Sequence, residues 1–145
     1  RIWRFFMSNF IKSYQANVGL NHVPAYQVSG RPFASGSVSV ATATKVDFPY
    51  LTRWFQVINK AATPVNVGFS RAGVTNVPAG GTNFIAVDAS SSSGYGKSEV
   101  YDIKISELWL SGSTSVDVIA GLTTVPITRA TTTSGPSFSG SVGVG

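Results

Sequence analysis

Short apolar segments with a period of two residues recur along the chain, each bounded by Gly, Pro, Asn or Ser. The clearest is Pro64–Ser70, where Val65, Val67 and Phe69 alternate with small or polar residues. This is the period of a half-buried β-strand, because successive side chains of a strand point to opposite faces. The only candidate for a helix, Asn9–Ala16, is too short and too weakly patterned to be stable alone. The patterning therefore predicts an all-β chain.

The number of these segments predicts a sandwich. We expect strands over Val23–Val28, Ser37–Phe48, Tyr50–Ala61, Pro64–Ser70, Asn83–Val87, Tyr101–Ile105, Leu108–Leu110 and Val116–Ala120. The apolar positions change parity between Ile105 and Leu108, which marks a bulge or a corner. About seven or eight antiparallel strands in two packed sheets give a β-sandwich, of which the jelly roll is one standard form.

Composition divides the 145 residues into three parts. Residues 21–130 are long enough to form one β-sandwich domain without a metal or a disulfide. Residues 1–20 form an aromatic N-terminal arm without a clean strand or helix period, and residues 131–145 form a Ser/Thr/Gly-rich tail. We expect both terminal segments to be ordered by neighbouring subunits and not by the domain's own core. Met7-Ser8-Asn9 has the form of a natural start, which leaves open whether Arg1–Phe6 belong to the natural product.

The residues that most enzymes and metal sites need are scarce. The chain has no cysteine and one histidine, His22, which excludes a disulfide scaffold, a cysteine-based zinc site and a His-rich metal site. The six carboxylates form no calcium-loop or metalloprotease pattern. Gly94–Ser98 lacks the first glycine and the following helix of a phosphate-binding loop. We therefore expect no catalytic residue, no cofactor and no metal.

Charge is low for a chain of this length. Charged residues make up 12% of the chain, and the formal net charge is +5. A typical protein has about twice that charged fraction. Arg1, Arg4 and Lys12 lie in the arm, and the remaining charges are scattered, which does not favour a specific nucleic-acid partner. No apolar run approaches the roughly 18–20 residues that span a bilayer, so we do not expect integral membrane association.

Aromatic and basic residues are the candidates for contacts between subunits, because such side chains are enriched at the centres of protein interfaces. We assign Trp54 to the core. Trp109 is interpreted either as a core residue or as an interface anchor. The candidate interface residues are Trp3, Phe6, Phe10, Arg31, Phe33, Arg53 and Trp109.

Five short motifs occur in a characteristic order between Tyr26 and Thr123. They are Val28–Gly36 (VSGRPFASG), Phe48–Phe55 (FPYLTRWF), Val65–Ser70 (VNVGFS), Glu107–Gly112 (ELWLSG) and Val118–Thr123 (VIAGLT). In their order and spacing they resemble the penton proteins of nucleocytoplasmic large DNA viruses. The resemblance implies a single jelly roll of two antiparallel four-stranded sheets, without catalysis. It also implies a homopentamer at the five-fold vertex of the virion's icosahedral capsid, in contact with the double jelly-roll major capsid protein and minor capsid proteins.

Two other functions are compatible with a small all-β chain. A carbohydrate-binding β-sandwich, such as a lectin-like or fibre-tip receptor-binding module, needs an exposed aromatic ring, and Tyr95 in the Ser/Gly loop is the best candidate. A jelly-roll enzyme of the cupin kind generally needs several metal-ligating histidines, and this chain has one. Glycan binding and the oligomeric state would separate the carbohydrate-binding function from the penton function.

Overall fold

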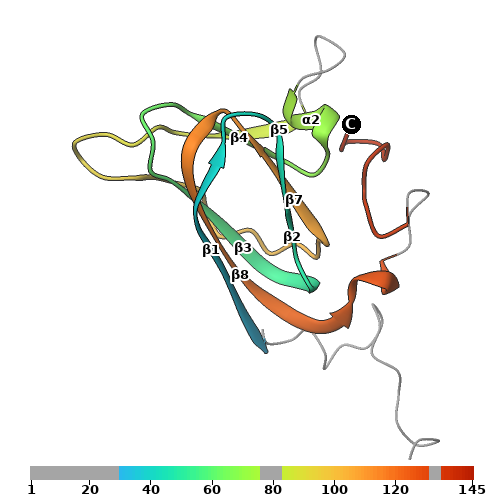
Figure 1. Ribbon diagram of the computed structural model, residues 1–145. Coiled ribbons are helices and arrows are strands. Elements are labelled where there is room, and N and C mark those ends of the chain that lie inside the picture. The colour runs from blue at the N-terminus through green and yellow to red at the C-terminus, as the bar shows by residue number, and fades with distance from the viewer. Residues whose placement is uncertain (1–29, 76–82, 131–134) are drawn as a thin grey trace, which may run out of the picture.

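The computed structural model of the chain describes residues 30–75, 83–130 and 135–145 (Figure 1). Its elements are β1 (Arg31–Val40), β2 (Thr44–Asp47), β3 (Tyr50–Asn59), β4 (Val65–Gly68), α2 (Arg71–Thr75), β5 (Phe84–Val87), β6 (Gly96–Lys97), β7 (Glu107–Ser111), β8 (Ser113–Pro126) and the 3₁₀ turn η2 (Ile127–Arg129). The strands form two four-stranded sheets in the orders β1-β8-β3-β6 and β2-β7-β4-β5. The predicted all-β sandwich of two antiparallel four-stranded sheets is confirmed.

The pairing of the strands gives the winding of the chain. The first strand pairs with the last, β1 with β8, and the series continues inward with β2 and β7, β3 and β6, and β4 and β5, each pair antiparallel. The chain is thus one long hairpin that has been rolled up, so that alternate pairs of strands fall in alternate sheets. This is the connectivity of a single jelly roll.

The core lies between the two sheets and follows the period-two pattern. On β8, Val116, Val118 and Ala120 are buried, and they face Val65 and Val67 of β4 in the same apolar cluster. The other sheet-forming members of the cluster include Val57, Leu108, Leu110 and Leu122. Strands β3, β4, β7 and β8 therefore contribute alternate residues to the core, which is the period-two pattern that predicted them.

The chain passes from one sheet to the other at Gly112. This residue alone separates β7 from β8, and its φ is +109°, a conformation that favours glycine. The amide of Gly112 donates to the carbonyl of Val40 at 2.7 Å, which fixes the corner against the end of β1. Ser111-Gly112-Ser113 therefore forms the corner between the two sheets.

Some strand boundaries differ from the prediction. The segment expected as a strand over Ser37–Phe48 belongs to two strands, because β1 begins at Arg31 and a bend separates it from β2. Tyr101–Ile105 is not a regular strand, since it makes one isolated bridge, from Tyr101 to Phe55. The change of parity after Ile105 is therefore a corner before β7. The expected strand Val23–Val28 and the helix candidate Asn9–Ala16 lie outside the described residues.

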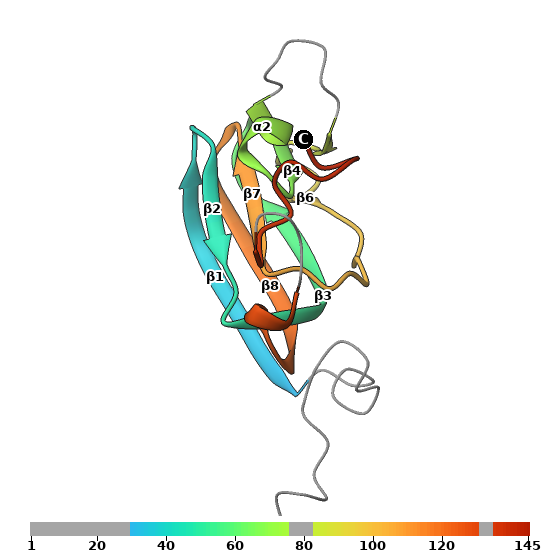
Figure 2. The same cartoon turned by 90° about the vertical axis from the view of Figure 1, so that its right-hand side faces the viewer.

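Residues 135–145 pack on the domain itself. Figures 1 and 2 show this segment running along the outside of the sheet that contains β7 and ending beside α2. The hydroxyl of Ser106 donates to the carbonyl of Pro136, and the hydroxyl of Ser70 donates to the carbonyl of Val144. The expectation that neighbouring subunits alone would order the tail is thus wrong for these residues. Phe138 also packs against the core cluster, so an apolar contact as well as hydrogen bonds holds this segment on the domain.

Candidate assembly surfaces

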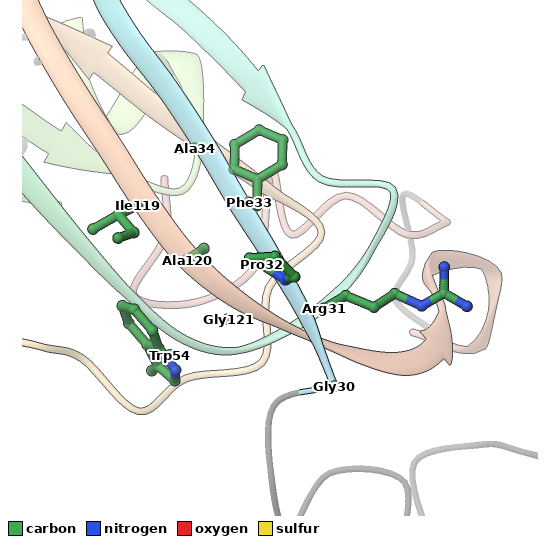
Figure 3. Close-up of a pocket in the computed structure, with 9 residues that line it drawn as sticks. All are labelled: Gly30, Arg31, Pro32, Phe33, Ala34, Trp54, Ile119, Ala120 and Gly121. Carbon is green, nitrogen blue, oxygen red and sulfur yellow. The ribbon is translucent and has the colours of Figure 1, made fainter.

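An open groove lies on the outer face of the sheet formed by β1, β8 and β3 (Figure 3). Its volume is about 380 Å³. It is lined by Gly30, Arg31, Pro32, Phe33, Ala34, Trp54, Ile119, Ala120 and Gly121. Most of these residues are apolar, so this outer-face groove offers van der Waals surface more than hydrogen-bonding groups.

Strand register explains the shape of the outer-face groove. Gly121 on β8 lies opposite both Pro32 on β1 and Trp54 on β3, so these three residues form one row across the sheet. Because Gly121 has no side chain, the floor is low between the proline ring and the indole. In the next row Ala34 lies opposite Ile119, whose side chain is 40% exposed. A sheet face that meets only water usually carries polar residues at such positions.

Trp54 is half-buried on this outer face and is not a core residue, so its assignment to the core was wrong. The cause is a bulge in β3. Thr52 pairs with Leu122 and Trp54 pairs with Gly121, so two steps along β3 match one step along β8. The additional residue, Arg53, reverses the parity, and Trp54 points outward where an unbroken strand would have pointed it inward.

Two of the candidate interface residues, Arg31 and Phe33, line the outer-face groove, but their side chains are engaged on its far side. The guanidinium carbon of Arg31 lies 4.4 Å from the centre of the Tyr50 ring. The Phe33 ring meets the Phe48 ring edge-on, with 5.0 Å between their centres. Figure 3 shows both side chains directed away from Trp54. They hold the end of β1 in place more than they offer free contact area.

The other two described candidates lie away from the outer-face groove. The Arg53 guanidinium forms an ion pair with Asp102 at 3.1 Å. Trp109 is half-buried on β7, between Lys45 and Gly68 of the neighbouring strands, and its buried indole nitrogen has no hydrogen-bond partner among the described residues. The remaining candidates, Trp3, Phe6 and Phe10, lie outside the described residues.

Glu107 anchors the C-terminal segment on the other sheet. It is the only buried one of the six carboxylates, all of which are described. The hydroxyl of Ser137 donates to its Oε1 at 2.6 Å, and the ammonium of Lys45 lies 3.6 Å from its Oε2. Together with Ser106 and Pro136 these residues line a second hollow of about 270 Å³. Sequence reasoning missed this contact, because the partners are thirty residues apart and form no local motif.

Asp117 fixes a second irregularity, in β1. Ser37 has a φ of +55°, and its amide donates to the Asp117 carboxylate at 2.7 Å. Lys60 completes the cluster, with its ammonium 3.1 Å from the same carboxylate oxygen and 2.9 Å from the Ser37 hydroxyl. The backbone hydrogen bond from Ser37 and the charge of Lys60 hold the pKa of Asp117 below its ordinary value.

The described residues offer no arrangement for metal binding. They contain no group of three or more His, Cys, Asp or Glu side chains that could hold a metal ion. His22 lies outside the described residues. Gly96 and Lys97, from the segment compared with a phosphate-binding loop, form the short strand β6. In the described ranges no helix is both long enough and apolar enough to cross a bilayer.

Comparisons of the chain with protein-family models, with curated proteins and with solved structures found no match. The jelly-roll assignment therefore rests on the strand order alone.

Proposed function

We propose that this chain is a structural capsid protein, five copies of which form the vertex of a large icosahedral DNA virus. The observation that carries the proposal is the position of the five penton-like motifs in the fold. Val28–Gly36 includes the start of β1, and Phe48–Phe55 includes most of β3. The other motifs include β4, β7 and a central part of β8. The residues that carry the resemblance thus lie in five of the eight strands of the rolled hairpin.

The surface chemistry supports a subunit that is covered by neighbours. Only 12% of the chain is charged, and the outer face of β1, β8 and β3 exposes apolar side chains in its central rows. A ring of five identical subunits uses two different surfaces of each subunit, one for each neighbour. The major capsid protein and minor capsid proteins would contact the outside of such a ring. This function needs no cofactor and no catalytic residue.

The native mass of the full chain tests the proposal. We expect a species with five times the 15.2 kDa of one chain, measured by native mass spectrometry, and five-fold averages of the particles in electron micrographs. A stable monomer over a wide range of concentrations would contradict the vertex function. A ring with another number of subunits would contradict it as well, while leaving a structural role in place.

The second candidate function is carbohydrate binding, for which the exposure of Tyr95 is the relevant observation. Its side chain is 57% exposed in the loop between β5 and β6, and the same loop carries Ser91 and Ser93, whose hydroxyls are hydrogen-bonded to each other. An exposed ring in a loop that also carries hydroxyl groups can stack on a sugar and bond to it. A glycan array with the full chain and the Tyr95→Ala variant separates the functions. Binding that Tyr95→Ala abolishes, from a monomeric chain, would favour the carbohydrate function.

A further inference from the structure

The lining of the outer-face groove limits what it can bind. Among its residues only Arg31 and Trp54 have polar side-chain atoms, and Arg31 is turned toward Tyr50. The backbone of its floor is used by strand pairing, since β8 lies between β1 and β3. A sugar needs several directed hydrogen bonds from its site. The groove therefore favours an apolar, aromatic occupant over a carbohydrate.

The chain itself supplies such an occupant. The segment before β1 joins the domain at Gly30, a residue that lines the outer-face groove. This segment carries Trp3, Phe6 and Phe10 within its first ten residues. Nineteen residues separate Phe10 from Gly30, and an extended chain covers roughly 3.3–3.6 Å per residue. The aromatic residues can thus reach an adjacent subunit.

Two considerations favour a second copy of the chain as the source of the segment. The groove and the segment are different surfaces of one subunit, so the contact between copies is heterologous, the type of contact that forms a ring when the rotation between copies closes. Three aromatic side chains bury roughly 450–750 Å² in total, at 150–250 Å² each. That approaches the roughly 800 Å² per partner of a standard specific interface.

We propose that the outer-face groove binds the aromatic N-terminal segment of a second copy of this chain, with an aromatic ring of that segment placed between Trp54 and Pro32 above Gly121. The inference rests on the proposed function, because it assigns a contact between the subunits of the ring. It names both sides of that contact, the groove on one copy and Trp3, Phe6 and Phe10 on the other.

A photo-crosslinking experiment on the full chain tests the contact directly. The benzophenone amino acid p-benzoylphenylalanine replaces Phe6, and the unlabelled variant is mixed with ¹⁵N-labelled chain before irradiation. We expect cross-linked peptides that join unlabelled position 6 to labelled residues 32–34 or 119–121. Cross-links confined to one isotope would place the segment on its own domain and overturn the proposal. Cross-links only outside the groove, or none, would overturn it too.

A charge in the groove provides the second measurement. Ile119→Lys puts an ammonium group at a 40% exposed position of the groove, and burying that charge under an aromatic ring is costly. We expect the yield of mixed cross-links to fall about tenfold, a change of roughly 1.4 kcal/mol in association. The matched control is Ile85→Lys, which changes an isoleucine of similar exposure, 44%, on β5 of the other sheet. Equal yields from both variants would overturn the proposal.

A replacement variant and the native mass separate the possible outcomes. If Ile119→Lys fails to fold, Ala34→Arg replaces it, because Ala34 is exposed on the edge strand β1 in the same row. The native mass separates this inference from the proposed function. A pentamer whose cross-links avoid the groove overturns the contact alone. Groove cross-links between copies in an assembly that is not pentameric overturn the vertex function and leave the contact standing.

Discussion

The buried side chain of Asn59 makes four hydrogen bonds in the described core, and its removal should lower the free energy of unfolding. The side chain is fully buried at the end of β3. Its amide nitrogen donates to the carbonyls of Thr63 at 2.7 Å and Asp88 at 3.1 Å. Its amide oxygen accepts from the amide of Ala61 at 3.2 Å and from the hydroxyl of Ser113 at 2.8 Å. One side chain therefore ties β3 to three other parts of the chain.

The expected loss in the free energy of unfolding follows from these four hydrogen bonds. Asn59→Ala leaves two carbonyls, one amide and one hydroxyl without their partner, at a net cost of roughly 1 kcal/mol for each bond. The sum is about 4 kcal/mol, a large part of the roughly 5–15 kcal/mol by which a domain is stable. For a chain of this length it corresponds to a fall in Tm of roughly 10–20 °C.

Urea unfolding followed by tryptophan fluorescence measures this free energy. Asn66→Ala on the neighbouring β4 is the control, because Asn66 is only half-buried and should change the free energy of unfolding by less than about 1 kcal/mol. Asn59→Asp keeps the acceptors but turns both donors into an acceptor facing two carbonyls, so we expect it to cost at least as much as alanine. A loss below about 1 kcal/mol for Asn59→Ala would refute the reasoning from hydrogen bonds.

Four further predictions follow from described contacts and from the division of the chain. Because folding lowers the pKa of Asp117, its carboxylate stabilises the fold above the ordinary pKa of 3.8, and this stabilisation is lost as the pH falls through the folded-state pKa. In urea titrations at several pH values, wild type should therefore lose more free energy of unfolding on acidification than Asp117→Asn does. Parallel curves for the two proteins would contradict this. Thr52→Val removes the bonds of the Thr52 hydroxyl with the Ile103 carbonyl and the Ile105 amide and should cost roughly 1–3 kcal/mol in urea unfolding, whereas Thr52→Ser should recover most of it. In Gly73→Ala the new methyl carbon would lie 2.6 Å from the Val144 carbonyl oxygen, so carboxypeptidase should remove the C-terminal segment faster than in wild type, as read by intact mass. Deletion of residues 1–12 should leave the Tm of the isolated domain nearly unchanged and weaken its incorporation into particles; unfolding on truncation would show that the arm belongs to the core.

The strands that the sequence predicts well are those with one apolar face and a clear turn on each side. Val65 and Val67 on β4, and Val116 and Val118 on β8, alternate with polar or small residues, and the structure buries all four. Burial on one face enforces this alternation, because a shift by one residue would expose the whole apolar set. Strands with one apolar face must pack against each other in two sheets, and the order of the strands within each sheet then follows from the rolled hairpin.

The parts that the sequence did not predict depend on contacts between distant residues. The C-terminal segment is mostly Ser and Gly apart from Phe138, which packs against the core cluster, so hydropathy does not reveal that Ser137 bonds to Glu107 and Ser70 to Val144. The short strand β6 is only two residues long, too few to establish a period. Both features come from hydrogen bonds that join segments far apart in the chain, and local patterns do not carry that information.

The outer-face groove originates at a point where the local pattern misleads. An unbroken period of two assigns Thr52 and Trp54 to the same face, and Thr52 is fully buried, so the indole would have entered the core. The bulge at Arg53 instead keeps Phe55 and Val57 in the core and turns Trp54 outward above Gly121. Bulges of this kind re-aim side chains at functional positions. A half-buried aromatic ring that an irregularity turns outward leaves apolar surface in contact with water unless another surface covers it. This is the physical reason to look for the partner of the chain at this groove.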